Sequence, residues 1–236
     1  MLNTFYYPEI LVRPVAVSNF IGKSSFAIPR RAVGESSHWG HGTSAVGFLG
    51  SVETFENIEV PVVRLDSDCQ DGFDFVKLDL QGGEKSALQG LGSNIMRAKL
   101  IYSEFQLLTR SQDSTLSFLL DCGFICFFDR LQIGIKADQK DIPLTLLSNL
   151  GLVVEQLIPP DIRGVGDGFM LFGYLHDRQS TAQDFMGLLS ISDIQQLREA
   201  GVFYVQTDII AFRPSFYNKI ISLIWDLLTY KLILRR

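Results

Sequence analysis

Residues 73–91 contain the pattern that decides the fold. They read Phe-Asp-Phe-Val-Lys-Leu-Asp-Leu-Gln-Gly-Gly-Glu-Lys-Ser-Ala-Leu-Gln-Gly-Leu. The apolar residues of Phe73–Leu80 predict a strand, and the sequence Gln81-Gly82-Gly83 ends it. Glu84–Leu91 is predicted to be a helix whose one face carries Ala87, Leu88 and Leu91. The stretch therefore reads as strand, tight turn and helix.

Strands continue to alternate with helices on both sides of this stretch. Other strands are predicted at Glu9–Val17, Ser24–Ile28, Val60–Leu65, Leu100–Phe105, Phe124–Phe128, Leu152–Leu157, Phe169–Leu175 and Val202–Phe212, and other helices at Ser114–Cys122, Leu144–Leu150 and Ser192–Ala200. Such alternation predicts an α/β architecture with a mostly parallel sheet.

Two charged residues, Lys77 and Asp79, lie near the carboxyl end of the best predicted strand. Side chains alternate along a strand, so both are expected on the same side, although a parallel sheet covered on both faces calls for apolar residues there. Glu84 begins the next helix, and Glu104 ends the next strand. Ligands bind at the carboxyl ends of such strands, where Asp79 and Glu104 could share one site. The alternative is structural: Lys77 forms an ion pair with Asp79 or Glu104, and Glu84 is a helix-terminal charge.

Asp74–Gly90 also resembles the central motif of the FkbM family of S-adenosylmethionine-dependent methyltransferases. That motif is a hydrophobic strand, Lys-x-Asp-x-(Glu/Gln)-Gly-(Ala/Gly)-Glu and a helix closing with Leu-x-Gly. Weaker similarities follow the family's order at Val15–Ser18, Arg64–Asp66, Ile101–Glu104, Leu119–Phe124 and Gln206–Arg213. The resemblance is good over residues 12–130 and looser as far as 213.

The resemblance implies a class I methyltransferase fold, which is Rossmann-like, over residues 1–213, with S-adenosylmethionine as the cofactor. It implies methyl transfer to a hydroxyl of a sugar or natural-product-like acceptor. Such a transfer needs an aligned acceptor oxygen and a base for its proton. Asp79, with Lys77 nearby, is the candidate for positioning the acceptor or removing its proton, with Glu84 and Glu104 in support.

The family's cofactor loop, an acidic-x-Gly-x-Asn-x-Gly turn after the first strand, has no counterpart in the chain. The sheet therefore lacks its first two strands in this interpretation, and Ser18 and Asp66 are the only candidate remnants of the cofactor site. We expect a truncated or split sequence, whose activity alone is doubtful. Two alternatives stay open: a non-catalytic binding or assembly module, and a hard-metal-dependent enzyme using Asp79, Glu84 and Glu104.

Two other motifs are weak. Gly164-Val-Gly166-Asp-Gly168 follows no strand and precedes no helix, so a turn is expected rather than a phosphate loop. His38 and His41 lack further metal ligands nearby, and a loop is expected there. Cys69, Cys122 and Cys126 fit no zinc spacing and are expected to be buried thiols.

The formal net charge of the 236 residues is -5, and no basic run suggests a nucleic-acid partner. No signal peptide opens the chain, so the cytoplasm is the expected location. Residues 214–236 are predicted to form a C-terminal amphipathic helix, which packs on the body or a partner chain, with a peripheral membrane contact or a membrane span as alternatives.

Overall fold

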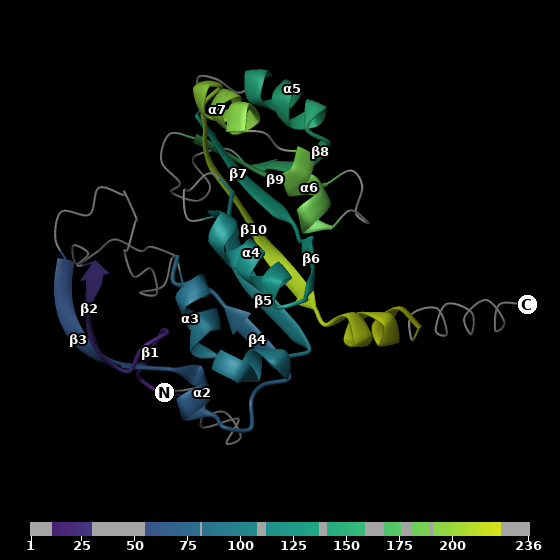
Figure 1. Cartoon of the computed structure of the whole chain (residues 1–236). Coiled ribbons are helices and arrows are strands. Elements are labelled where there is room, and N and C mark those ends of the chain that lie inside the picture. Colours follow the sequence, from purple (N-terminus) through teal and green to yellow (C-terminus); the bar gives the residue numbers. More distant parts are fainter. Residues whose placement is uncertain are drawn as a thin grey trace, which may run out of the picture. The chain divides into compact units, whose positions relative to one another are not determined.

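The structure is a computed structural model that describes residues 11–29, 55–80, 82–107, 112–136, 141–158, 168–175, 181–188 and 191–222. The chain divides into two compact units. Unit 1 is Met1–Gly72 with Leu80–Ile95, and unit 2 is Phe73–Asp79 with Met96–Arg236. Figure 1 shows the elements of both units, and each unit is described by itself.

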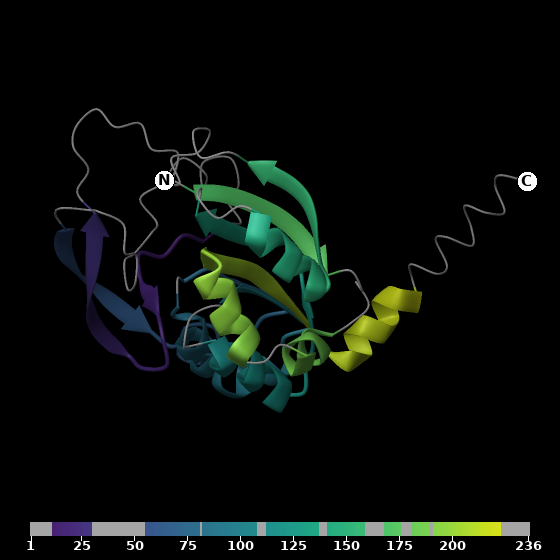
Figure 2. The ribbon, with the colours of Figure 1, turned by 90° about the horizontal axis from the view of Figure 1, so that it is seen from above.

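Unit 1 contains a three-stranded sheet in the order β1-β3-β2. Its strands are β1 (Ala16–Val17), β2 (Gly22–Pro29) and β3 (Phe55–Val63). β2 and β3 are antiparallel and lie side by side in both views (Figures 1 and 2), whereas β1 is parallel to β3. The predicted strand at Ser24–Ile28 is confirmed and is longer than expected. The one at Glu9–Val17 reduces to β1 among its described residues, after Pro14, which cannot donate a backbone hydrogen bond.

The helices of unit 1 follow its sheet. They are α2 (Leu65–Asp68), α3 (Glu84–Gly90) and most of the 3₁₀ helix η1 (Gly92–Met96). The predicted strand at Val60–Leu65 therefore ends early, because Leu65 already begins α2. The predicted helix at Glu84–Leu91 is confirmed, and Ala87, Leu88 and Leu91 are completely buried.

Gly90 is the last residue of α3, where the chain passes close to another segment. A Cβ atom at this position would lie 2.2 Å from the backbone oxygen of Ser18. Only glycine therefore allows the segment after β1 to contact the end of α3. This contact gives a physical reason for the glycine of the Leu-x-Gly pattern.

Unit 2 is built on a seven-stranded sheet in the order β4-β5-β10-β7-β9-β8, with β6 also paired to β10. The strands are β4 (Phe75–Leu78), β5 (Leu100–Gln106), β6 (Ile125–Phe128), β7 (Leu131–Lys136), β8 (Leu152–Ile158), β9 (Gly168–Leu175) and β10 (Val202–Phe212). The neighbouring strands β4 and β5 are parallel, as predicted.

The prediction of a mostly parallel sheet is wrong. Every pairing of unit 2 other than β4 with β5 is antiparallel. The reason lies in β10, which occupies the place beside β5 and runs in the opposite direction. A hydrophobic pattern marks where a strand lies along the chain but not which strand becomes its neighbour. The chain is therefore mixed α/β, which is consistent with a methyltransferase fold.

Four helices of unit 2 contact its sheet or one another (Figure 1). They are α4 (Gln112–Asp121), α5 (Asp141–Asn149), α6 (Ala182–Leu188) and α7 (Ile191–Glu199). α4 contacts β5 and β6, α6 contacts β6, α7 contacts β10, and α5 contacts β8 and α7. The helices predicted near residues 114, 144 and 192 are thus confirmed.

The two faces of the sheet in unit 2 differ in burial. Ile101, Phe105, Val205, Ile209 and Ala211, at odd-numbered positions of β5 and β10, are buried. The side chains of Tyr102, Gln106, Gln206 and Asp208 on the other side are half-buried, and Glu104 among them is buried. We call this second side the polar face, formed by Lys77, Tyr102, Glu104, Gln106, Gln132, Gln206 and Asp208.

Residues 214–222 form a helix that follows β10. This is the part of the predicted C-terminal amphipathic helix that the structure describes. Among the described residues, no helix is both long enough and apolar enough to cross a membrane. The division at residue 213, the partner or membrane contact of 215–236 and the cytoplasmic location stay predictions.

Candidate active site

β4 brings Lys77 to the polar face. Phe75 and Lys77 are exposed, whereas Val76 and Leu78 are buried. One face of β4 is thus exposed and the other is buried, as the charged residues of this strand indicated. Asp79, which follows the strand, is also exposed, as expected for a side chain on the same side as Lys77.

β5 places polar side chains next to Lys77. Tyr102 is the register partner of Lys77, and the Lys77 ammonium lies 6.0 Å from the centre of the tyrosine ring. Glu104, two residues farther along, is only 4% exposed and accepts a hydrogen bond of 3.0 Å from the side-chain amide of Gln106. Because Leu78 pairs with Ser103, Asp79 follows at the level of Glu104, as the sequence predicted.

β10 adds a carboxyl group on the other side of β5. Asp208 is the register partner of Glu104, so two acidic residues face each other across this antiparallel pair. The Tyr102 hydroxyl oxygen lies 3.0 Å from a carboxylate oxygen of Asp208 and 2.9 Å from one of Asp129. Tyr102, Asp129 and Asp208 form what we call the tyrosine–aspartate triad.

Asp129 reaches the triad because of an interruption between β6 and β7. Both strands pair with β10, and Asp129 and Arg130 lie between them. The backbone N–H of Asp129 donates to the backbone oxygen of Asp208 at 2.9 Å, so the segment stays attached to β10. The Thr207 hydroxyl donates to the backbone oxygen of Asp129 at 3.3 Å. Local interruptions of this kind redirect side chains next to functional sites.

The triad perturbs the acidity of its members. Burial raises the pKa of Asp208, and the charges of Asp129 and Asp79 raise it further, against the hydrogen bond from Tyr102 and the charge of Lys77. The pKa of Tyr102 is also raised, first by burial and then by its two aspartate neighbours. Perturbed acidity of this kind is typical of functional sites.

Glu84 lies in unit 1 and contacts the backbone. It is 5% exposed, and its carboxylate oxygens accept hydrogen bonds from the N–H of Leu80 at 2.8 Å and of Gly82 at 2.9 Å. Gly82 has a φ of 103°, which strongly favours glycine. Glu84 thus fixes the turn before α3, which agrees with the structural alternative for this residue.

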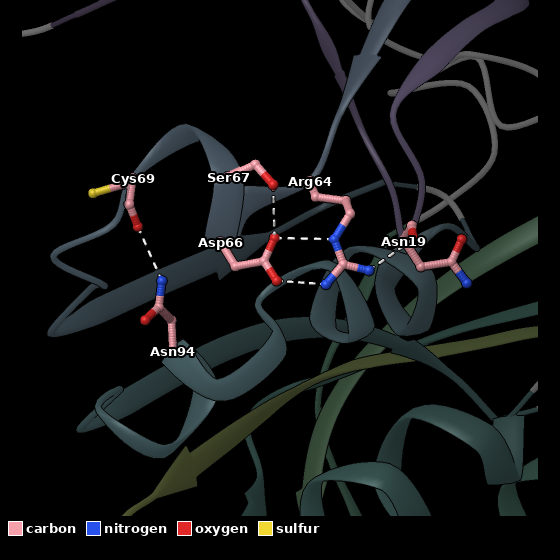
Figure 3. A network of polar contacts seen from close by, with 6 residues as sticks. All are labelled: Asn19, Arg64, Asp66, Ser67, Cys69 and Asn94. Carbon is pink, nitrogen blue, oxygen red and sulfur yellow. Dashed lines mark hydrogen bonds and ion pairs between the residues drawn. The ribbon is translucent and has the colours of Figure 1, made fainter.

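Asp66, one of the two candidate cofactor residues, lies in a polar cluster of unit 1 with Asn19, the neighbour in sequence of the other candidate, Ser18 (Figure 3). The Asp66 carboxylate is held by the Arg64 guanidinium, with Nε 3.0 Å from one oxygen and Nη2 against the other. Arg64 also donates to the backbone oxygen of Asn19 at 3.1 Å, and Ser67 donates to Asp66 at 3.2 Å. The hydrogen bond from Arg64 lowers the pKa of Asp66. These contacts engage Asp66 in the structure of unit 1.

Several motifs considered in the sequence do not enter this site. His38, His41 and residues 164–167 lie outside the described residues. Within the described ranges, no group of three or more His, Cys, Asp or Glu residues is arranged to hold a metal ion. The metal-dependent alternative therefore finds no support there. Cys126 is buried as expected, whereas Cys69 and Cys122 are half-buried.

Sequence reasoning missed the triad as a unit. Tyr102 lies in Ile101–Glu104 and Asp208 in Gln206–Arg213, two segments that resemble the family. The alternation of Gln206 and Asp208 with apolar residues also indicates a polar side of β10. Asp129 gives no such signal, because its position depends on the interruption between β6 and β7.

Comparison with known proteins gives one match. The family model described as the methyltransferase FkbM domain matches residues 3–126. This match begins at residue 3, whereas the motifs predicted a good resemblance from residue 12. No curated protein and no solved structure matches the chain significantly. The matched span contains Ser18, Asp66, Lys77, Asp79, Glu84, Tyr102 and Glu104, and it ends before Asp129 and Asp208.

Proposed function

The chain belongs to the family of FkbM methyltransferase domains, and we propose that it transfers a methyl group from S-adenosylmethionine to a hydroxyl of a sugar or natural-product-like acceptor. The observation that supports this most directly is the position of Lys77 and Asp79. Both belong to the family's central motif, and both are exposed beside the polar face of unit 2. Charged side chains at the end of a strand are accessible to a ligand there.

The polar face offers the chemistry that a hydroxyl acceptor needs. Carboxylates accept hydrogen bonds from hydroxyl groups, and Lys77 donates to acceptor oxygens. In this proposal Asp79 and Lys77 bind the acceptor and align its reacting oxygen. Glu104, beside them on β5, supports Asp79, and Glu84 acts at a distance by fixing the turn that follows Asp79.

The described residues fit the cofactor in part. S-adenosylmethionine supplies an electrophilic methyl group on a positively charged sulfur, and the acidic side chains of Asp79 and Glu104 suit a positive charge. Ser18 and Asp66 fit the ribose of the cofactor less well, because both residues already make other contacts. Arg64 and Ser67 already contact the Asp66 carboxylate, and the Ser18 backbone oxygen lies against Gly90.

Calorimetry with S-adenosylmethionine tests binding by the full chain, and transfer of an isotope-labelled methyl group to a panel of sugars tests activity. The proposal predicts binding and labelled product. Asp79→Asn should lower kcat/KM by about 10- to 100-fold, mostly through KM, because one charged hydrogen bond to the acceptor is weakened.

Asp74→Asn is the matched control. Asp74 lies next to the same strand, forms an ion pair with Lys99 at 2.8 Å and has a side chain that is 77% exposed. It should leave kcat/KM unchanged. If the full chain neither binds S-adenosylmethionine nor transfers the methyl group, the proposal is contradicted. That result would favour a non-catalytic binding module.

A further inference from the structure

The tyrosine–aspartate triad needs one proton more than its tyrosine provides. The Tyr102 hydroxyl oxygen lies 2.9 Å from an oxygen of Asp129 and 3.0 Å from an oxygen of Asp208. Each contact is of hydrogen-bond length and requires a hydrogen atom between its oxygens. A tyrosine has one hydroxyl hydrogen, and an ionised carboxylate has none. One of the two carboxyl groups must therefore be protonated to satisfy both contacts.

The surroundings indicate which carboxyl holds this proton. Asp208 is half-buried, whereas Asp129 is exposed, so ionisation costs more at Asp208. Asp79, Glu104 and Asp129 present acidic groups to Asp208 from three segments, and Lys77 is the basic group that acts on it. Burial and the charges of Asp129 and Asp79 raise the pKa of Asp208. With the proton on Asp208, Asp208 donates to Tyr102 and Tyr102 donates to Asp129; once Asp208 is ionised, it accepts from Tyr102 instead.

We propose that the triad shares this proton and that Asp208, in its ionised form, accepts the proton released when the acceptor hydroxyl is methylated. This assignment rests on the proposed function. Methylation forms a carbon–oxygen bond on the acceptor, breaks the carbon–sulfur bond of the sulfonium donor with its electron pair left on sulfur, and frees the hydroxyl proton. Asp208 takes that proton, which leaves Asp79 the task of holding the acceptor.

The triad also provides a route by which the proton can pass from Asp208 to solvent. When Asp208 donates its proton to the Tyr102 oxygen, Tyr102 can donate its own hydrogen to Asp129 along contacts that already exist. Asp129 is exposed and releases the proton to water. A base whose pKa approaches the working pH is also the most efficient one, so the raised pKa of Asp208 suits this role.

Infrared spectroscopy of the full chain labelled only at aspartate carboxyls tests the shared proton without requiring activity. The wild type should show the C=O band of a protonated aspartic acid at neutral pH. Asp208→Asn and Asp129→Asn should each abolish it, because an asparagine amide donates to Tyr102 and no extra proton is needed. Tyr102→Phe should move the band to higher pH, because it removes the hydrogen bond that lowers the pKa of Asp208, and Asp74→Asn should leave it unchanged. Absence of the band from the wild type, or its persistence in both triad variants, would overturn the shared proton.

The dependence of kcat on pH tests the role of Asp208. In the wild type kcat should rise with pH as Asp208 ionises, and Asp208→Asn should lower kcat by about 100-fold or more and flatten this rise. A uniform loss at every pH would show a structural role and contradict the assignment. If the wild type shows the band but transfers no methyl group, the proposed function and the role of Asp208 as proton acceptor both fail, whereas the shared proton stands.

Discussion

The Arg64–Asp66 cluster of unit 1 and the tyrosine–aspartate triad of unit 2 both hold aspartates in hydrogen bonds, but with opposite effects on acidity. Asp66 contacts a guanidinium, and its pKa is lowered. Asp208 contacts a neutral hydroxyl and lies among other carboxyls, and its pKa is raised. A cation stabilises the charged form of a carboxyl, whereas burial and like charges disfavour it.

This difference separates a structural cluster from a chemical one. Asp66 stays ionised and ties α2 to the segment after β1 through Arg64. Asp208, whose pKa is raised, is the residue that we propose to accept the proton of the acceptor hydroxyl. Substitutions in the two clusters test this contrast, and the one expected to change stability most comes first.

Gly92→Ala should disrupt the unit 1 cluster directly. A Cβ atom there would lie 2.3 Å from an Asp66 oxygen, and the φ of 52° favours glycine. We expect the free energy of unfolding to fall by about 2–4 kcal/mol, the sum of backbone strain and overpacking. Urea denaturation measures it.

Gly151→Ala is the control for that measurement. Gly151 has a similar φ of 75°, but a Cβ atom there would meet nothing within 4 Å. It should cost only about 1–2 kcal/mol of backbone strain. Equal losses in the two variants would show that contact with Asp66 contributes nothing to the stability of unit 1.

The two aspartates should also give opposite dependences of stability on pH. The pKa of Asp66 is lowered by folding, so its contribution is present above the unfolded pKa and is lost as pH falls through the folded pKa. The pKa of Asp208 is raised, so its contribution is present below the unfolded pKa and is lost as pH rises through the folded value.

Urea denaturation over a series of pH values tests both signs. Asp66→Asn should remove part of the loss of stability on acidification, and Asp208→Asn should remove part of the loss on raising the pH. The same sign of change in both variants would contradict the contrast between the two clusters.

Lys77→Met should have the smallest effect. The Lys77 charge lowers the pKa of Asp208, so its removal should raise that pKa slightly and move the infrared titration of Asp208 to higher pH. Lys23→Met is a suitable control, since Lys23 lies in unit 1 and pairs with Glu59. A shift to lower pH would mean that Lys77 does not act on Asp208 as a positive charge.

Local sequence predicted the elements around the central motif well. Apolar spacing identified β4, α3 and β5, because each of these segments buries one side. It also indicated that Asp79 and Glu104 lie at the same edge of the sheet if their strands are neighbours, and β4 and β5 are parallel neighbours. The expectation of a parallel sheet failed because the partner of β5 is β10, and strand pairing depends on contacts between distant segments.

The sequence by itself determined the family and the placement of Lys77 and Asp79, because both depend on residues close together in the chain. Only the tertiary structure decided that Tyr102 meets Asp129 and Asp208, which come from three separate strand regions. The physical reason is that acidity depends on burial and on charges nearby in space, and neither can be read from the order of residues.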